Sequence, residues 1–301
     1  MSERTVTPPG RQGPGAVPGR LVERLGLDVA RRAAGLLPGE LRAPGAGLGT
    51  ELAQLRAYRV GDDVRQLDAA ATARTGEPHV RLQVPERALT TWLVVDVSPS
   101  MAFGSAQRLK SDVAEGAGSV VARLAVRHGG RLGVMFAGGP ASRMLPPRSG
   151  QGAAAAACEL LRRGVAADGA SDPRDVARAL ERVRRLARPD SLVVVISDFR
   201  DAVGAKRVLA AIGARHSLVA LEVTDPREAS LPAVGHLSLV DPETGALVRV
   251  DTRQRALRER FAYAEAERRE QLRDELRRAR AEHIVLSTEG DWLRDLGRRL
   301  R

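Results

Sequence analysis

Oxygen-bearing side chains cluster directly after the most apolar stretch of the chain. Residues 96–100, Asp-Val-Ser-Pro-Ser, begin with the last residue of the run TTWLVVD and place one carboxylate and two hydroxyls at alternate positions. Such side chains can converge on one point as the chain turns off a strand, and oxygen ligands completed by water suit a hard cation. A second carboxylate ends the apolar run SLVVVISD. The pattern predicts a partly filled site for Mg²⁺ or Mn²⁺, which a partner's carboxylate can complete, formed by Asp96, Ser98, Ser100 and Asp198.

Three apolar runs end in an aspartate, which indicates how these side chains are positioned. The runs at 91–96, 191–198 and 217–225 are continuous but too short for helices, as is typical of strands buried on both faces. Because helical patterns alternate with them, we expect an α/β fold with a doubly wound, mainly parallel sheet. Ligands bind such a sheet at the carboxyl ends of its strands, where the strand order reverses. Asp96 and Asp198 should meet there, whereas the last run's aspartate, Asp225, has the simpler alternative role of capping the next helix.

The remaining elements follow from periodicity and turn signals. Residues 131–137 and 283–287 have the pattern of strands, and 236–251 contains two strand-like runs around a Pro-Glu-Thr-Gly turn, which indicates a surface hairpin. Asp172 is the predicted N-cap of a helix that has Pro173 at its first position. Helices are predicted over 105–128, 150–164, 173–187, 203–214, 253–281 and 290–300.

The chain ahead of residue 89 differs in composition from the rest. Residues 1–20 are rich in Pro, Gly and polar types and lack apolar periodicity, so we expect a disordered tail. Residues 21–88 contain a helical pattern, a Gly-rich link and a run at 80–84 that alternates like an edge strand. We expect this segment to pack on a main domain at 89–301, pinned by ion pairs among Glu51, Arg56, Asp62, Asp63, Arg65, Asp68 and Arg74.

The positive charge of the chain comes almost entirely from arginine. The formal net charge is +11 and the pI is near 11.1, which raises the alternative of an Arg-rich nucleic-acid-binding protein. Only Lys110 and Lys206 are lysines, and many arginines alternate with Glu or Asp, which favours GC-rich bacterial codon usage and solvated ion pairs. The single Cys158 excludes an intramolecular disulfide. No apolar stretch has the length of a signal-peptide core or a membrane span, so we expect a cytoplasmic protein.

An enzymatic alternative is a Mg²⁺-dependent hydrolase or phosphotransfer enzyme that uses Asp96. Chemistry of the haloacid-dehalogenase type needs a second aspartate two residues later, where this chain has Ser98. Neither a Gly-x-Gly-x-x-Gly fingerprint nor a Walker lysine motif occurs. A serine nucleophile needs a base, and no motif links the serines to any of the histidines, which are His79, His128, His216, His236 and His283. We therefore expect no enzymatic activity.

Two groups of motifs resemble known families. Residues 96–100 and the sequence ISDF at 196–199 resemble the metal-ion-dependent adhesion site of von Willebrand factor A domains. The DPETGALVRVDT hairpin and the pair Glu86-Arg87 resemble the domain of unknown function 58 family. Together with the segment 47–74, they extend that likeness over about residues 40–300. The segment 47–74 resembles the signature of the same family through Gly47, Gly49, Glu51, Arg56, Tyr58, Gly61, Asp62, Asp63, Arg65, Asp68 and Arg74.

The resemblance implies a von Willebrand factor A-like fold and a soluble interaction or adaptor module with a degenerate adhesion-type site. Members of the family are commonly paired with MoxR-type AAA+ ATPases, so it also implies such a partner. Arg174 stands where the adhesion site has a threonine, and an inward-pointing guanidinium would neutralise the carboxylates in place of a metal ion unless Ser171 or Asp172 substitutes. Ala69 stands where the family usually has a tryptophan.

Overall fold

The computed structural model describes residues 51–60, 62–84, 89–138, 143–166, 172–200, 204–241 and 244–299. The described residues belong to two compact units, which divide between Ala88 and Leu89. The predicted tail at 1–20 and the helical pattern at 21–37 lie outside the described residues.

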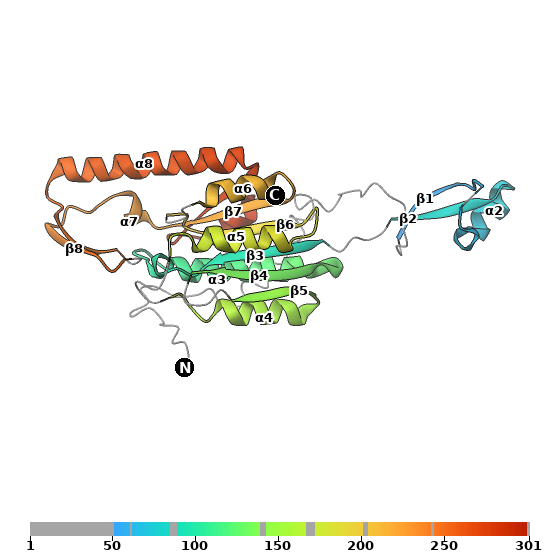
Figure 1. The fold of residues 1–301 in the computed structure, drawn as a ribbon, viewed down its shortest axis with the longest axis horizontal. Helices are drawn as coiled ribbons and strands as arrows, with labels where there is room; N and C mark the ends of the chain where they lie inside the picture. Colours follow the sequence, from blue (N-terminus) through green and yellow to red (C-terminus); the bar gives the residue numbers. More distant parts are fainter. Residues whose placement is uncertain are drawn as a thin grey trace. The chain divides into compact units, whose positions relative to one another are not determined.

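A six-stranded sheet forms the centre of the larger unit (Figure 1). Its strand order is β10-β7-β6-β3-β4-β5, and every neighbouring pair is parallel except β4 and β5. The strands are β3 (Thr90–Asp96), β4 (Arg131–Ala137), β5 (Met144–Ser149), β6 (Leu192–Ser197), β7 (Ser217–Thr224) and β10 (Ala281–Ser287). The predicted doubly wound, mainly parallel α/β fold is confirmed.

The order of the strands reverses beside β3. The chain passes from β3 to β4 and β5 on one side, then returns to the other side of β3 for β6, β7 and β10. The point between the carboxyl ends of β3 and β6 is therefore the topological switch point, where ligands bind open α/β sheets. The register pairs Val95 with Ile196, so the residues that follow these two strands leave the sheet side by side.

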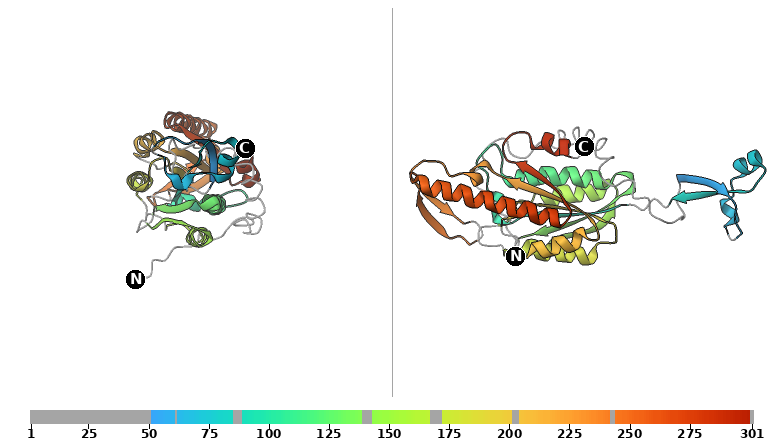
Figure 2. Two further views of the ribbon diagram at one scale, coloured as in Figure 1. Left: turned by 90° about the vertical axis from the view of Figure 1, so that its right-hand side faces the viewer. Right: turned by 90° about the horizontal axis from the view of Figure 1, so that it is seen from above.

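Helices cover both faces of the sheet because each presents an apolar stripe to it (Figure 2). On α5, Val176, Ala179, Leu180 and Val183 are buried at the spacing of one helical face. One face carries α3 (Lys110–Ala125), α4 (Gln151–Leu161) and α9 (Trp292–Arg299), and the other carries α5 (Asp175–Leu186), α6 (Ala205–Gly213) and α8 (Arg255–Arg278). None of the helices among the described residues combines the length and apolar character needed to cross a membrane.

Three local predictions need correction, and one holds. The strand β5 lies between the predicted strand at 131–137 and the predicted helix at 150–164, where no element was predicted. Its Pro146 and Pro147 resemble loop residues, but prolines are tolerated on an edge strand, where no further strand needs an amide hydrogen at their positions. The helix α5 begins at Asp175 because the Asp172 carboxylate accepts the amide of Arg174 and caps a turn ahead of it. The α3 helix begins later than predicted. The predicted hairpin is confirmed, with strands β8 (His236–Val240) and β9 (Leu247–Asp251).

The smaller unit contains a hairpin and a short helix. Strands β1 (Glu51–Ala57) and β2 (His79–Val84) pair antiparallel, and α2 (Ala69–Thr75) and a 3-10 turn (Val64–Gln66) lie between them in the chain. Both terminal nitrogens of Arg56 donate hydrogen bonds to Asp62, at 2.8 and 2.7 Å. The Asp68 carboxylate accepts a hydrogen bond from the amide of Ala71 at the start of α2. These contacts join residues of the smaller unit, and the expectation that ion pairs pin this segment on the main domain stays a prediction.

Two glycines within helices differ in whether an added Cβ would have room. A Cβ on Gly116 of α3 would lie 2.4 Å from a ring carbon of the fully buried Trp292, whereas a Cβ on the exposed Gly152 of α4 meets nothing within 4 Å. We expect Gly116→Ala to lower the free energy of unfolding by about 1–3 kcal/mol through overpacking. Gly152→Ala should instead raise it by up to about 1 kcal/mol. Urea unfolding of both variants tests this, and equal shifts would contradict the predicted contact.

Candidate functional site

Asp96 lies at the end of β3 and is buried at the switch point. Its Oδ1 accepts the amide of Ser98 at 2.9 Å, and its Oδ2 accepts the hydroxyl of Ser197, at the end of β6, at 2.6 Å. The hydroxyls of Ser98 and Ser100 lie 3.0 Å apart, and both residues are buried. The fold therefore brings Asp96, Ser98 and Ser100 together, but Asp96 contacts the backbone of Ser98 and a serine that the sequence did not single out.

Asp198 follows β6 and is paired with a lysine. Its Oδ2 accepts the ammonium of Lys110 at 2.5 Å, and its Oδ1 accepts the amide of Arg200 at 3.1 Å. The same ammonium donates to Glu228 at 2.6 Å. Lys110 is 0% exposed, and its nitrogen lies 5.8 Å from the centre of the Phe103 ring. A buried cation thus joins two carboxylates at the edge of the sheet.

The environment of this cluster shifts the pKa values of its two aspartates in opposite directions. Burial and the neighbouring Asp198 charge raise the pKa of Asp96 to about 6, against the hydrogen bonds from Ser197 and Ser98. Burial also opposes ionisation of Asp198, but the Lys110 ammonium overcomes it and lowers the pKa of that carboxyl. Burial works against the charge of Lys110, yet Asp198 and Glu228 raise its pKa above the usual value. Lys110 and Asp198 are therefore a charged pair, and Asp96 is the carboxyl that holds its proton more readily.

Glu228 is held in place by the aspartate that ends β7. It lies on the short helix α7 (Pro226–Ala229), and its carboxylate accepts the backbone amide of Asp225 while Asp225 caps the same helix. Asp225 also accepts the amide of Ser105 at 2.7 Å and the hydroxyl of Thr288 at 2.6 Å. Asp225 therefore caps a helix, which was the simpler of the two roles considered from the sequence, and it also positions Glu228.

The ion pairs continue from this cluster towards α8. Arg200 lies 3.0 Å from Glu228 and 3.0 Å from Glu265, and Glu265 lies 3.0 Å from Arg268. Glu228 and Glu265 are largely buried, and each has arginine or lysine partners on more than one element. The acidic cluster is thus one end of a network that connects the edge of the sheet to the long helix.

Arg174 does not supply the positive charge of the site. Its side chain is exposed, so its guanidinium does not point inward, where it would neutralise the carboxylates. It lines an open groove of about 730 Å³ on α5, together with Ala177, Arg178, Glu181, Arg182, Arg185 and Gly204. The exposed carboxylate of Asp172 pairs with Arg178 at 3.0 Å, and Ser171 lies outside the described residues.

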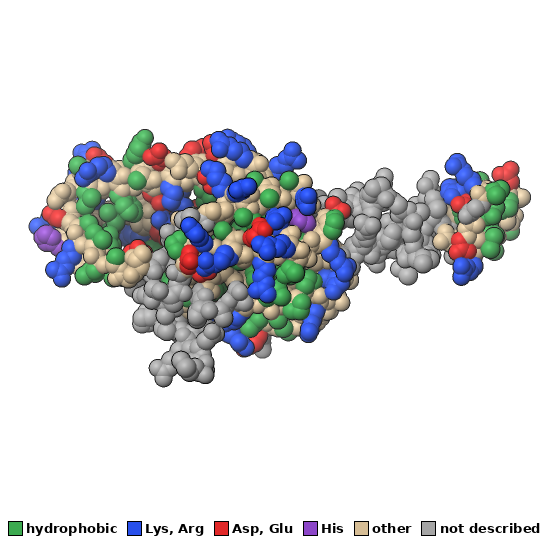
Figure 3. All heavy atoms as spheres, viewed as in Figure 1, with side chains coloured by type: hydrophobic (Ala, Val, Ile, Leu, Met, Phe, Trp, Pro, Cys, Tyr) green, Lys and Arg blue, Asp and Glu red, His purple; other side chains and the backbone are tan. Residues whose placement is uncertain are grey.

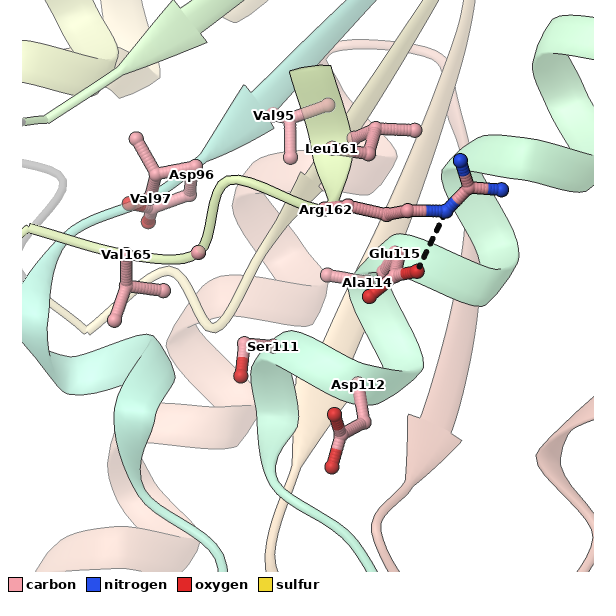
Figure 4. Close-up of a pocket in the computed structure, with 11 residues that line it drawn as sticks. Val95, Asp96, Val97, Ser111, Asp112, Ala114, Glu115, Leu161, Arg162 and Val165 are labelled. Atoms are coloured by element: carbon pink, nitrogen blue, oxygen red, sulfur yellow. Dashed lines mark ion pairs between the residues drawn. The ribbon is translucent and has the colours of Figure 1, made fainter. Parts of the chain in front are cut away.

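A small cavity adjoins Asp96 (Figure 4). It measures about 80 Å³ and is lined by α3, the end of β3 and the chain that follows α4. Glu115 and Arg162 form an ion pair at 3.9 Å on its border. Pockets for small-molecule ligands usually measure about 300–1,000 Å³, so this cavity has room for water and little else.

The donor set does not fit a divalent ion as it stands. No three His, Cys, Asp or Glu side chains in the described part of the chain gather so that they could hold a metal ion. Both Asp96 oxygens and both Asp198 oxygens already accept hydrogen bonds from the chain itself. The positive charge that two adjacent carboxylates require comes from Lys110. Sequence reasoning missed Lys110 and Glu228, although the rarity of lysine in this arginine-rich chain was an available signal.

Fold and site together define an α/β protein with a doubly wound, mainly parallel sheet and a buried cluster of acidic side chains at its carboxyl edge. The chain matches the family described as "Protein of unknown function DUF58" over residues 54–271 and belongs to that family. Uncharacterized proteins of Mycobacterium tuberculosis and Mycobacterium bovis are each 39% identical to it over 274 residues, which is 91% of this chain and 86% of theirs.

Solved structures similar to the chain include two that share little sequence identity with it. BatB from Bacteroides thetaiotaomicron is 14% identical with a TM-score of 0.45, over 71% of this chain and 97% of BatB. The SpRpn10 VWA domain is 12% identical with a TM-score of 0.38, over 69% of this chain and 93% of that domain.

The raised pKa of Asp96 predicts a pH-dependent stability. Because its folded pKa of about 6 exceeds its ordinary value of 3.8, its contribution is fully present below pH 4 and is lost as the pH rises through 6. Between pH 4 and 7 the wild type should therefore lose up to about 3 kcal/mol relative to Asp96→Asn, which does not titrate. Denaturant unfolding of both proteins at intervals of pH measures the difference, and parallel curves would contradict the assignment.

Proposed function

We propose that this chain is a non-enzymatic interaction module of the cytoplasm that docks a MoxR-type AAA+ ATPase on the carboxyl edge of its sheet. The observation that carries the proposal is the exposed aromatic ring of Phe103 directly beside the buried Lys110 cluster. The von Willebrand factor A-like fold and membership of the DUF58 family support an interaction role. The resemblance to that family supplies the class of partner.

The arrangement of the site supports binding over catalysis. The hydroxyls of Ser98 and Ser100 lie 3.0 Å apart, and both residues are buried, so neither hydroxyl is presented to a substrate from solvent. Asp96 adjoins a cavity of about 80 Å³, too small for a substrate of ordinary size. An assay of phosphatase activity with and without Mg²⁺ tests the enzymatic alternative, for which we expect no turnover above background.

Phe103 has the properties of an interface anchor. It follows the 3-10 turn Pro99–Ala102 at the end of β3, and its backbone carbonyl accepts the amide of Lys110 at 2.8 Å. Phe103 is 44% exposed, whereas Ser100, Met101 and Lys110 around it are buried, so a packed support carries an apolar surface. Aromatic side chains on such supports contribute much of the binding energy at protein interfaces.

We expect Phe103→Ala to weaken binding of the MoxR-type ATPase of the same genome at least tenfold, because truncating an anchor costs about 2 kcal/mol or more. The matched control is Leu186→Ala. Leu186 is similarly exposed, at 47%, but it ends α5 and therefore lies towards the opposite edge of the sheet. Biolayer interferometry with the immobilised ATPase measures both affinities.

Equal losses in the two variants would show that the carboxyl edge has no special part in docking. A wild-type protein that binds no MoxR-type ATPase from its genome would contradict the proposed partner. Circular dichroism of each variant establishes that its fold is retained before the affinities are compared.

The nucleic-acid alternative predicts tight DNA binding, which the surface does not favour. Arginine and lysine side chains are interspersed with Asp and Glu over α5, α6 and α8 (Figure 3), and many are paired, as Arg178 with Asp175 and Arg184 with Glu181. We expect binding to random duplex DNA at physiological salt no tighter than about 10⁻⁴ to 10⁻⁶ M. Fluorescence anisotropy measures this, and nanomolar, sequence-selective binding would contradict it.

A further inference from the structure

We propose that the Lys110 ammonium is the resident cation of the acidic site and compensates Asp198 in place of the divalent metal ion that the adhesion-site resemblance predicts. The inference concerns the same edge of the sheet as the proposed function and extends it. It is tested on the isolated chain, so that it and the proposed docking can fail separately.

The geometry of Lys110 is that of a bound ion. Its nitrogen lies within 2.6 Å of one carboxylate oxygen of Asp198 and one of Glu228, which come from two different elements of the fold. It is shielded from water, with 0% of its side chain exposed, and the ring of Phe103 lies beside it. A buried ammonium persists only where carboxylates compensate it closely. The two carboxylates likewise depend on it.

The choice of lysine in this chain supports the assignment. Lys110 and Lys206 are its only lysines among 48 lysine and arginine residues. An arginine would present a planar fork suited to bidentate pairing, whereas an ammonium is a compact point charge that can sit between carboxylates from several directions. Lys206 lies at the surface instead, 60% exposed and paired with Glu275. Only Lys110 therefore occupies a position that needs a small buried cation.

A divalent ion cannot bind Asp198 Oδ2 while the ammonium lies 2.5 Å from that atom. Removing the ammonium leaves Asp198 without its ion-pair partner and Glu228 with Arg200 alone, and Asp96 is close enough to Asp198 for their charges to interact. Carboxylates in that condition, with serine hydroxyls beside them, favour a hard cation. The wild type should thus be indifferent to Mg²⁺ and Mn²⁺, and loss of the lysine should create a site.

The test is calorimetric titration of Mn²⁺ and Mg²⁺ into the wild type, Lys110→Ala and Lys206→Ala. We expect saturable binding of one Mn²⁺ by Lys110→Ala, at least tenfold tighter than any binding by the wild type or by Lys206→Ala. Asp198→Ala in the Lys110→Ala background should abolish the gained binding. A wild type that binds as tightly as Lys110→Ala, or a folded Lys110→Ala that binds no metal, overturns the proposal.

A second measurement decides the matter if Lys110→Ala does not fold. The melting temperature of the wild type should be the same in millimolar Mn²⁺, in millimolar Mg²⁺ and in a chelator, because bound ligands stabilise the folded state and none is expected. A metal-dependent rise in the wild type overturns the proposal. Arg174→Thr should also behave as the wild type does, since that side chain is exposed. Tighter metal binding by Arg174→Thr would instead support an arginine-blocked metal site.

Discussion

The buried ion pair between Lys110 and Asp198 constrains much of the larger unit. An ammonium with no exposure to water is strongly destabilising unless carboxylates remain within hydrogen-bond distance. Lys110 begins α3, Asp198 follows β6 and Glu228 belongs to α7, so satisfying one charge requires the start of α3, the end of β6 and the helix α7 to lie together. The capping of α7 by Asp225, which also binds Ser105 and Thr288, holds the third of these elements. The elements at this edge of the sheet therefore depend on one another for their positions.

This constraint extends through ion pairs to the outer helix layer. Glu228 is shared between Lys110 and Arg200, and Glu265 of α8 is shared between Arg200 and Arg268. A displacement of α7 would therefore break contacts on both of its sides at once. Because partly buried pairs are screened less by salt than exposed ones, the network resists separation in a way that the surface pairs along α8 do not. The position of the long helix is thus tied electrostatically to the site.

The parts of this structure that are predictable from sequence are those with local signals. The apolar runs that became β3, β6 and β7 are visible because buried parallel strands need continuous apolar residues. Their terminal aspartates point to the correct edge. The role of Lys110 depends on partners 88 and 118 positions away, and its local sequence indicates only the start of a helix. The strand β5 was missed because its two prolines carry a loop signal that only its edge position overrides.

A lysine and a metal ion give the same sheet edge different chemical capacities. A metal ion with water in its shell can exchange that water for a partner's carboxylate, so recognition passes through the ion. The ammonium of Lys110 is covalently attached, is buried and already has two carboxylate acceptors, so it has little capacity to take a third from outside. Asp96 is likewise occupied by Ser98 and Ser197. The proposed docking at this edge therefore uses the surface that the cluster supports, and the exposed Phe103 has its ring beside the Lys110 ammonium.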